Sequence, residues 1–289
     1  MKRLKDVDMS KYTTFRAGGR AAELVLIDNE EELVQVTRVV RQSGREFMMM
    51  GNGSNLLFTD GGYQGIVLKL QGDFCTMHVE DDRLIVGSGV LMSQVASRAL
   101  AEGLTGFEFA SGIPGTMGGA VTMNAGAYGA EIVKVVRLVR MLDLKYMMKC
   151  EYASSEMNFS YRHSLVKEHP FVVLEVEMEL MKGNEEIIRK RMDDYKEQRD
   201  AKQPLDYPSA GSTFKRPAKH YAGKLIEDAG LRGHQIGGAR VSDKHCGFII
   251  NTGNATASDI LKLMIEVQKR VFDRFHVKLE PEICFLGWK

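Results

Sequence analysis

The sequence predicts a mixed α/β protein of two domains that meet near residue 183. Its 289 residues are about twice the length of an average domain. Segments with apolar residues at helical spacing alternate along the chain with short apolar segments typical of strands. The composition changes at Gly183-Asn184, after which the chain becomes highly charged and favourable to helix. We therefore expect domains at 1–183 and 184–289, each containing helices and strands.

The N-terminal half begins with an amphipathic helix and several strands. A helix is expected at Glu30–Gln42, because Leu33, Val36 and Val40 recur at helical spacing and Gly44 can end it. Short apolar runs typical of buried strands follow at Phe47–Met50, Ile66–Leu70, Leu84–Val86 and Ile132–Met141.

Two further elements complete this half. Ser93 is expected to cap a short helix that ends near Gly103. Phe171–Leu180 alternates between apolar and charged residues, with Glu175 and Glu177 on the polar face. Such alternation is typical of a half-exposed strand.

The C-terminal half contains two predicted helices. The charged segment Glu185–Lys202 favours a helix that Pro204 ends. A second helix is better defined, because Thr256 and Asp259 have the spacing of a capping box and apolar residues follow at helical spacing.

Charge and cysteine content exclude several classes of protein. Lys and Arg (39) balance Asp and Glu (38), so we expect no nucleic-acid partner. No apolar run is long enough to span a bilayer, and no signal peptide is evident, so we expect no membrane association. The four cysteines are widely spaced and the seven histidines form no zinc pattern, which predicts reduced thiols, no metal site and a cytoplasmic location.

The first glycine-rich segment, Gly51–Asn55, directly follows the predicted strand Phe47–Met50. Two glycines allow close approach of a ligand, and Ser54 adds a hydrogen-bonding group, as in an anion-binding loop. The segment is neither a Walker A loop nor a dinucleotide fingerprint, because no Gly-Lys-Ser/Thr follows and Leu56 replaces the third glycine. From this segment alone, a ligand loop and a plain turn are both open.

A second segment is richer in glycine. Residues 103–129 contain eight glycines, where ordinary usage would give about two. A flexible linker would lack the interspersed apolar residues Phe107, Ile113 and Val121. Small residues among apolar ones indicate a backbone packed against a flat or extended ligand.

The two segments resemble the FAD-binding loops of the vanillyl-alcohol-oxidase type. With four further motifs, nearly the whole chain resembles the UDP-N-acetylenolpyruvoylglucosamine reductase family, in its shorter branch. The motifs are Phe159–Ser164, Gly211–Pro217, Ala222–Gly230 and Leu279–Ile283. The resemblance implies an α+β fold, with a two-lobed FAD-binding domain of the PCMH type at 1–183 and a C-terminal UDP-sugar-binding domain at 184–289.

The resemblance also implies an activity and its cofactors. NADPH would reduce FAD, and the reduced flavin would pass hydride to the vinyl carbon of UDP-N-acetylglucosamine enolpyruvate, forming UDP-N-acetylmuramate for peptidoglycan synthesis. No obligate protein partner is evident. The FAD-binding residues carried over are Gly51, Asn52, Gly53, Ser54, Asn55, Gly112, Ile113, Pro114, Gly115, Thr116, Gly118, Gly119 and Ala120.

Three residues match the family's catalytic residues. Hydride addition to an enolpyruvyl ether requires stabilisation of the developing enolate and a proton at the α-carbon. Ser212 matches the proton donor, and Arg162 and Glu282 match the residues that stabilise the enol-like intermediate. Without the motifs, Ser212 would be interpreted as a turn serine, Arg162 as a surface arginine and Glu282 as an exposed acid.

Other positions are less specific. Arg199, Lys202, Lys215 and Arg216 are the cations best placed to bind the UDP diphosphate, although a solvated basic face is also open. Cys284 stands where relatives commonly carry a basic residue, which puts local salt bridging in doubt.

Two other functions are left open by the residues. Another FAD-dependent oxidoreductase of the same fold should lack the Ser212 and Glu282 motifs. A non-catalytic sensor of flavin or nucleotide sugar would not need Arg162, Ser212 and Glu282 together.

Overall fold

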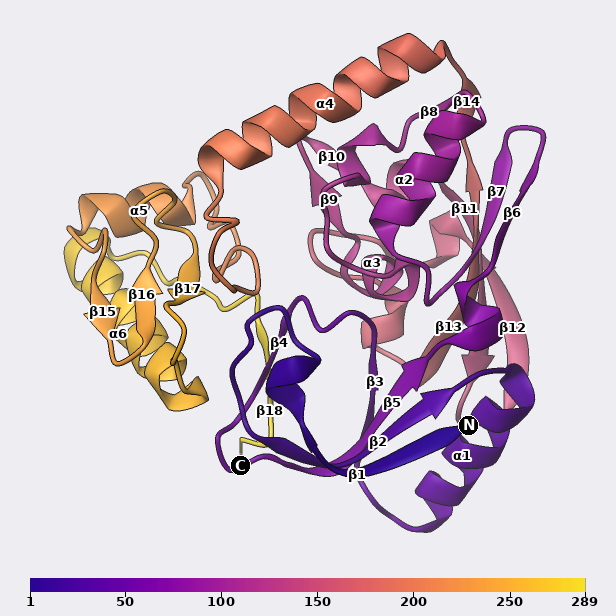
Figure 1. The fold of residues 1–289 in the computed structure, drawn as a ribbon, viewed down its shortest axis with the longest axis horizontal. Helices are drawn as coiled ribbons and strands as arrows, with labels where there is room; N and C mark the ends of the chain where they lie inside the picture. Colours follow the sequence, from indigo (N-terminus) through magenta and orange to yellow (C-terminus); the bar gives the residue numbers. More distant parts are fainter. Residues whose placement is uncertain (289) are drawn as a thin grey trace. The chain divides into compact units, whose positions relative to one another are not determined.

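The structure is a computed structural model and describes residues 1–288. The chain divides into two compact units (Figure 1). The first unit consists of Met1–Arg3, Val25–Asn52 and Val67–Arg199, and the second of Leu4–Leu24, Gly53–Ile66 and the residues from Asp200 onward.

The first unit is built on a five-stranded antiparallel sheet. The strand order is β12-β11-β13-β7-β6. The strands are β6 (Met77–Glu80), β7 (Arg83–Gly87), β11 (Val136–Asp143), β12 (Met148–Ala153) and β13 (Phe171–Glu179). Helices α2 (Met92–Ala101) and α3 (Met117–Met123) share one apolar core with the sheet, in which Val86, Val95 and Val121 are almost completely buried.

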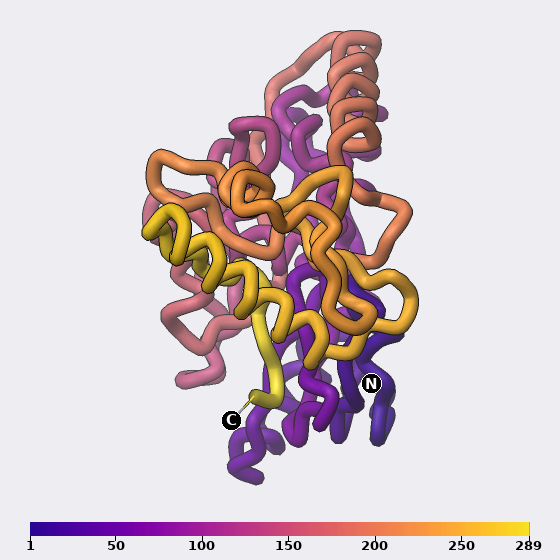
Figure 2. Tube along the Cα trace, turned by 90° about the vertical axis from the view of Figure 1, so that its left-hand side faces the viewer, coloured from indigo at the N-terminus to yellow at the C-terminus, as the bar shows by residue number. Residues whose placement is uncertain are grey.

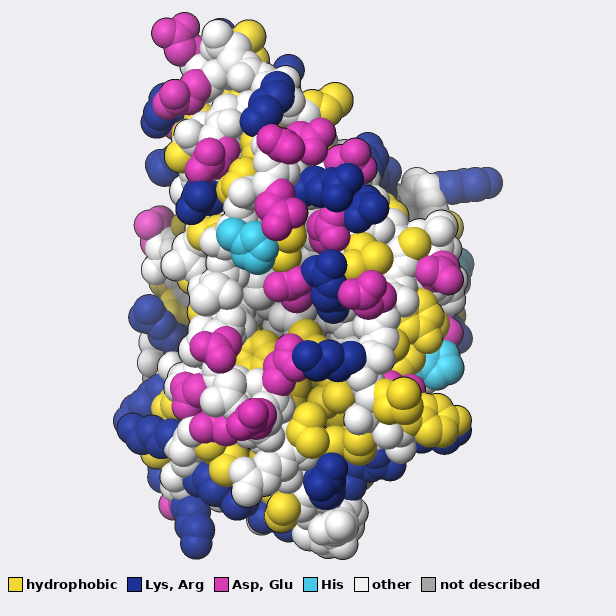
Figure 3. Space-filling view, turned by 90° about the vertical axis from the view of Figure 1, so that its right-hand side faces the viewer, with side chains coloured by type: hydrophobic (Ala, Val, Ile, Leu, Met, Phe, Trp, Pro, Cys, Tyr) yellow, Lys and Arg dark blue, Asp and Glu magenta, His cyan; other side chains and the backbone are white. Residues whose placement is uncertain are grey.

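Glutamates and arginines cover part of this sheet. The predicted alternation at Phe171–Leu180 is confirmed as β13, but Glu177 is not left to solvent. Its side chain is only 5% exposed, and Arg137 Nη1 donates to it over 2.5 Å. Arg83 and Arg140 lie within 3.6 and 3.5 Å of the same carboxylate. Because β13 is the central strand, neighbouring strands bring arginines against its polar face. Figure 3 shows cationic and anionic side chains interspersed on one side of the molecule.

The remaining elements of the N-terminal half follow the apolar pattern. The predicted helix is confirmed as α1 (Glu30–Gln42), whose N-cap Asn29 accepts from the Glu32 amide over 3.0 Å. A four-stranded sheet has the order β1-β2-β5-β3. Its strands are β1 (Lys2–Asp8), β2 (Arg20–Ile27), β3 (Phe47–Met50) and β5 (Tyr63–Leu70). Short paired strands are β8 (Leu104–Thr105) with β14 (Met181–Lys182) and β9 (Gly126–Ala127) with β10 (Ala130–Glu131).

Two local predictions were wrong. Helix α2 begins at Met92, so its N-cap is Leu91 and not Ser93. The Gln94 side chain accepts from the Leu91 amide over 3.1 Å. The expected strand at Ile132–Met141 begins with a 3-10 turn at Ile132–Lys134, and β11 starts only at Val136. Ile132 is completely buried, so its apolar character reflects packing of a turn and not strand pairing.

The predicted helix α4 (Glu185–Lys202) is confirmed and is mostly exposed, with Ile188 its one buried residue. In the second unit, α6 (Ala257–Phe275) packs on a sheet of β15 (Gln235–Ile236), β16 (Ala239–Val241) and β17 (Ile249–Asn251), and α5 (Ala222–Asp228) shares their apolar core. Figure 2 shows α6 as the long yellow coil. The parallel pair β18 (Cys284–Leu286) and β4 (Leu56–Phe58) completes the unit. The capping box of α6 is confirmed, since Thr256 Oγ1 accepts from the Asp259 amide over 3.0 Å.

Replacing Glu177 by alanine should destabilise the protein by about 1–2 kcal/mol, because three arginines lose a buried partner. Glu179→Ala is the matched control, as it removes an exposed glutamate from the same face of β13 and should change the free energy of unfolding by less than about 0.5 kcal/mol. Urea denaturation measures both. Equal losses would show that the arginine contacts add no stability.

Candidate functional site

In the first unit, the beginning of Gly51–Asn55 lies against the second glycine-rich segment. Gly51 follows the last residue of β3, and the Asn52 side-chain amide donates to the Pro114 carbonyl over 2.8 Å. A Cβ atom on Gly51 would lie 2.4 Å from Thr116 Oγ1, which leaves no room for a side chain. The structure therefore brings Gly51 and Asn52 together with Pro114 and Thr116.

The second segment is held by backbone hydrogen bonds to the turn before α2. The Gly115 carbonyl accepts from the Met92 amide over 2.9 Å, and the Gly118 amide donates to the Ser88 carbonyl over 2.8 Å. Thr116 caps α3 by accepting from the Gly119 amide over 3.4 Å. Gly118 packs so closely that a Cβ would lie 3.0 Å from Ser88 Cβ. The Ser88 hydroxyl is buried and, among the described residues, has no hydrogen-bond partner.

The other FAD-binding candidates of the first unit differ in exposure. Ala120 is 2% exposed and belongs to the apolar core, and Ile113 packs against that core. Gly112 lies against the side chain of Arg199, since a Cβ there would be 2.9 Å from Arg199 Nη1. Arg199 is thereby placed beside a glycine loop within the first unit.

Arg162 occupies the tip of a tight hairpin that is tied to α3. Ser160 and His163 pair across the hairpin, and Arg162 has a left-handed backbone with φ 58°. The buried Asn124, which caps the C-terminal end of α3, donates to the Ser160 carbonyl over 3.0 Å. Ser164 Oγ donates to the Thr122 carbonyl over 3.1 Å. The arginine is therefore fixed to the helix that follows the Gly112–Thr116 segment.

In the second unit, Ser212 lies in a segment that runs beside Glu280–Glu282. The Glu282 amide donates to the Thr213 carbonyl over 2.9 Å, and the Lys215 amide donates to the Glu280 carbonyl over 2.9 Å. Phe214 and Pro281 pair as an antiparallel bridge. The Ser212 and Glu282 segments therefore lie side by side in the second unit.

Neighbouring groups fix this strand of the second unit. Thr213 Oγ1 is buried and accepts from the Ile249 amide over 2.9 Å. The Thr213 amide donates to the Gly247 carbonyl, and His245 Nδ1 accepts from the Gly247 amide over 3.0 Å. Burial lowers the pKa of His245, which favours its neutral form near pH 7.

The end of the first glycine loop is attached to the same Glu282 segment. The Asn55 side-chain amide donates to the Glu282 carbonyl over 2.9 Å, and the Asn55 carbonyl accepts from the Cys284 amide over 2.9 Å. Cys284 Sγ lies 3.9 Å from the same amide nitrogen of Asn55. The first two residues of this loop thus belong to the first unit and its last three to the second, in which Ser54 is half-buried.

The predicted substrate cations occupy different environments. Lys215 Nζ lies 3.3 Å from Glu280 Oε2, so this ammonium already has an acidic partner. The Arg216 guanidinium lies 4.1 Å from the centroid of the Tyr221 ring. Lys202 is exposed at the end of α4. Lys215 and Arg216 are close to Ser212 in sequence and share its segment.

The chain is similar to known proteins over nearly its whole length. Residues 21–145 match an FAD-binding domain, and residues 203–286 match the C-terminal domain of UDP-N-acetylenolpyruvoylglucosamine reductase. The reductase of Caldanaerobacter subterraneus subsp. tengcongensis is 49% identical over 97% of this chain and 92% of its own, and that of Clostridioides difficile is 45% identical over 98% and 92%. The chain belongs to the UDP-N-acetylenolpyruvoylglucosamine reductase family.

A solved structure agrees with the family assignment. The chain is similar to the crystal structure of the UDP-N-acetylenolpyruvylglucosamine reductase from Thermus caldophilus, with a TM-score of 0.83 and 33% identity over 99% of this chain and 98% of that one. The expected α+β fold, with an FAD-binding domain and a C-terminal domain of this family, is confirmed. The protein is an FAD-dependent oxidoreductase of this family.

One segment beside these loops was missed from the sequence. A Cβ on Gly53, which has φ 64°, would lie 2.2 Å from the Tyr12 carbonyl oxygen. Thr14 Oγ1 donates to the Ser209 carbonyl over 2.7 Å, and the Thr13 hydroxyl is buried without a partner among the described residues. Asn251 binds this segment from 236 positions away, by donating to the Phe15 carbonyl over 3.0 Å. No local pattern predicts a contact over this sequence distance. The one local signal is the polar pair Thr13-Thr14 directly before Phe15.

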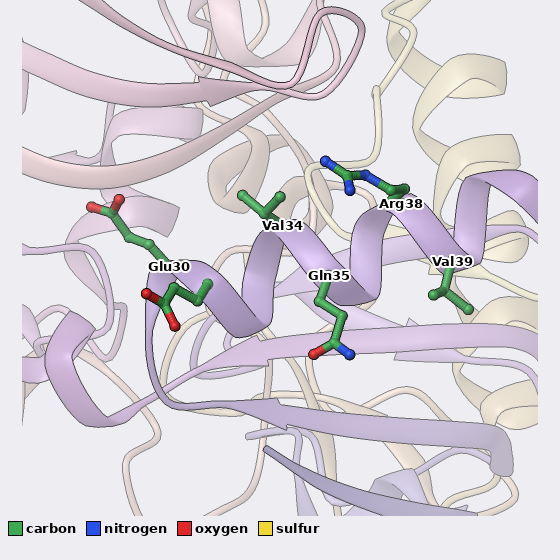
Figure 4. Close-up of a pocket in the computed structure, with 6 residues that line it drawn as sticks. Glu30, Val34, Gln35, Arg38 and Val39 are labelled. Atoms are coloured by element: carbon green, nitrogen blue, oxygen red, sulfur yellow. The ribbon is translucent and has the colours of Figure 1, made fainter.

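Other features of the described residues do not add to the site. A hollow of about 440 Å³ is lined by Glu30, Glu31, Val34, Gln35, Arg38 and Val39, all from the outer side of α1 (Figure 4). None of these is a predicted site residue. Within residues 1–288, no three His, Cys, Asp or Glu side chains are grouped as metal ligands, and no helix is long and apolar enough to cross a membrane.

Asn124→Ala should destabilise the Arg162 hairpin strongly. Asn124 is 1% exposed, and its side chain bonds to Glu131, Ser160 and the Val133 amide. We expect a loss of about 2–4 kcal/mol in the free energy of unfolding, measured by urea denaturation. Asn158→Ala is the control, because Asn158 is also left-handed but exposed; it should cost about 1 kcal/mol. Equal losses would mean that the buried bonds of Asn124 do not anchor the hairpin.

Proposed function

We propose that this protein reduces UDP-N-acetylglucosamine enolpyruvate to UDP-N-acetylmuramate with NADPH as reductant, in the cytoplasmic synthesis of peptidoglycan precursors. The observation that carries this proposal is the side-by-side placement of the Ser212 and Glu282 segments, with Asn55 bound to the Glu282 carbonyl. Relatives 45–49% identical over nearly the whole chain are named as this reductase. The pairing of these segments is an observation on the structure, whereas the identity to these relatives is an observation on the sequence.

The residues of the first unit fit an extended, anionic cofactor such as FAD. A Cβ on Gly51 would lie 2.4 Å from Thr116 Oγ1 and one on Gly118 would lie 3.0 Å from Ser88 Cβ, so Gly51 has no room for a side chain and Gly118 has little. The buried Ser88 hydroxyl has a free hydrogen-bonding capacity among the described residues, which a ligand could use. When bound, FAD accepts hydride from NADPH and delivers it to the β-carbon of the enolpyruvyl group. We propose that the residues at 51–55 and at 112–120 named above line its site.

The roles of three side chains follow from the chemistry of hydride addition. Negative charge develops on the substrate carboxylate, and a permanently charged guanidinium such as that of Arg162 can hold it. The α-carbon then needs a proton, which we assign to the Ser212 hydroxyl. A serine is a weak acid and needs support for the transfer; we propose that Glu282, whose segment pairs with that of Ser212, assists it and stabilises the enol-like intermediate. The rigid backbone pairing of Thr213 with Glu282 favours such a fixed relation.

Substrate binding and domain organisation complete the proposal. Arg216 and Lys215 share the segment of Ser212, and we propose that they, with Arg199 and Lys202, bind the UDP diphosphate. Lys215 is already paired with Glu280, so its ammonium must exchange this carboxylate for the diphosphate in order to bind the substrate. The matches at 21–145 and 203–286 support an FAD-binding domain at 1–183 and a substrate-binding domain at 184–289.

The two half-reactions separate the proposed role of Ser212 from a structural one. The purified protein should be yellow, NADPH should bleach it, and the enolpyruvyl substrate should restore the oxidised spectrum. Ser212→Ala should leave bleaching by NADPH nearly unchanged and slow reoxidation about 100-fold or more, because proton transfer is lost. Stopped-flow absorbance measures both rates.

Ser97→Ala, which removes an exposed hydroxyl from α2, serves as the control for this test and should alter neither rate. Equal slowing of both half-reactions by Ser212→Ala would assign Ser212 to binding or folding. A protein that takes up no FAD would overturn the whole proposal, and one that is bleached but not reoxidised by this substrate would be a different flavin-dependent oxidoreductase.

Gly51→Ala should weaken FAD binding by about 10-fold or more. The new methyl group would lie 2.4 Å from Thr116 Oγ1, so either the loop or the cap of α3 must shift. Gly61→Ala provides a matched control, because its Cβ would meet only Thr59 Oγ1, at 3.8 Å. FAD affinity is measured by fluorescence titration of the apoprotein; unchanged affinity in Gly51→Ala would remove this loop from the cofactor site.

A further inference from the structure

Lys69 lies directly behind the first glycine loop. It is near the end of β5, which neighbours β3 in the sheet, and β3 leads into Gly51. The Lys69 ammonium donates to the Gly51 carbonyl over 2.5 Å.

The charge of Lys69 has no acidic partner among the described residues. Its one hydrogen bond goes to a neutral carbonyl, although an ammonium carries three donors. Burial lowers the pKa of Lys69, and the electrostatic neighbour that opposes this shift is the thiol of Cys75. Burial in turn raises the pKa of Cys75, so the thiol is neutral near pH 7 and supplies no counter-charge.

An ammonium that is partly desolvated and has no acidic partner is unfavourable in free energy. A desolvated cation is normally paired, because an isolated charge loses hydration without a compensating interaction. A residue retained only to support the loop could use a neutral donor for the Gly51 carbonyl. The positive charge therefore points to an anion that binds at this place.

The surroundings of Lys69 specify which anion. Gly51 lies against Thr116, and Asn52 donates to the Pro114 carbonyl, so the ammonium sits behind the point where the two glycine-rich segments meet. Glycine backbone that no side chain covers, next to a cation, is suited to bind a diphosphate.

We propose that Lys69 is a cofactor-binding residue that fixes the Gly51 carbonyl and supplies the positive charge required by the diphosphate of FAD. This inference rests on the proposed function, since it takes FAD as the ligand of the glycine loops. It assigns the residue to the cofactor and not to hydride or proton transfer.

The direct test is equilibrium binding of FAD to the apoprotein. Lys69→Met removes the charge and keeps the length of the side chain, and it should weaken FAD binding about 10-fold or more. Lys69→Arg keeps the charge and should lose less. Lys182→Met is the matched control, because Lys182 also donates to a backbone carbonyl, that of Asp81 over 2.9 Å, but is exposed; its FAD affinity should equal that of the wild type.

Two further measurements separate charge from structural support. ADP, which carries the diphosphate, should lose affinity in Lys69→Met about as much as FAD does, whereas riboflavin, which lacks it, should not. The melting temperature of the Lys69→Met apoprotein should be equal to or above that of the wild type, because a partly buried charge without an acidic partner among the described residues has been removed. A lower melting temperature with unchanged FAD and ADP affinities would make Lys69 a structural residue and overturn the inference.

The wild-type titration distinguishes this inference from the proposed function. If the wild-type apoprotein binds neither FAD nor ADP, the FAD site itself has failed. If it binds both and Lys69→Met binds them equally well, only the assignment of Lys69 has failed. If Lys69→Met does not fold, Lys69→Gln replaces it, because it removes the charge and keeps a neutral donor for the Gly51 carbonyl; unchanged FAD and ADP affinities in that variant would overturn the inference.

Discussion

The loop Gly51–Asn55 is the constraint on which the rest of the site depends. Its first residues are held against Pro114 and Thr116, and its last residue is held to the backbone of Glu282 and Cys284. Glycine is required because carbonyl and hydroxyl oxygens, at Tyr12 and Thr116, already occupy the space that a Cβ would need.

Buried polar groups give the surrounding scaffold its specificity. Asn124 joins the end of α3 to the Arg162 hairpin, Asn251 joins β17 to the Phe15 segment, and Glu177 gathers arginines on the central strand. Each such group is expensive to bury and is therefore retained only with its partners in place. This dependence fixes the position of neighbouring loops more precisely than apolar packing could.

The sequence predicted regular elements well where one physical signal was dominant. The apolar spacing of α1 and the capping box of α6 are local, and both helices form at the expected residues. At Ile132 the same apolar signal was misleading, because a buried turn needs apolar residues as much as a strand does. At Leu91 the cap depended on the Gln94 side chain, so the expectation of a serine cap failed.

By itself, the sequence determined the family, the glycine-rich loops and the types of residue available for catalysis, since these are carried by short ordered motifs. It also placed Ser212 and Glu282 in separate motifs about seventy positions apart. Only the tertiary structure decided that their segments pair, that Asn55 binds beside them, and that Lys69 donates to the Gly51 carbonyl with no acidic partner within residues 1–288. The reason is physical: composition and spacing describe what a segment can do alone, whereas burial and charge compensation depend on which distant groups the fold brings against it.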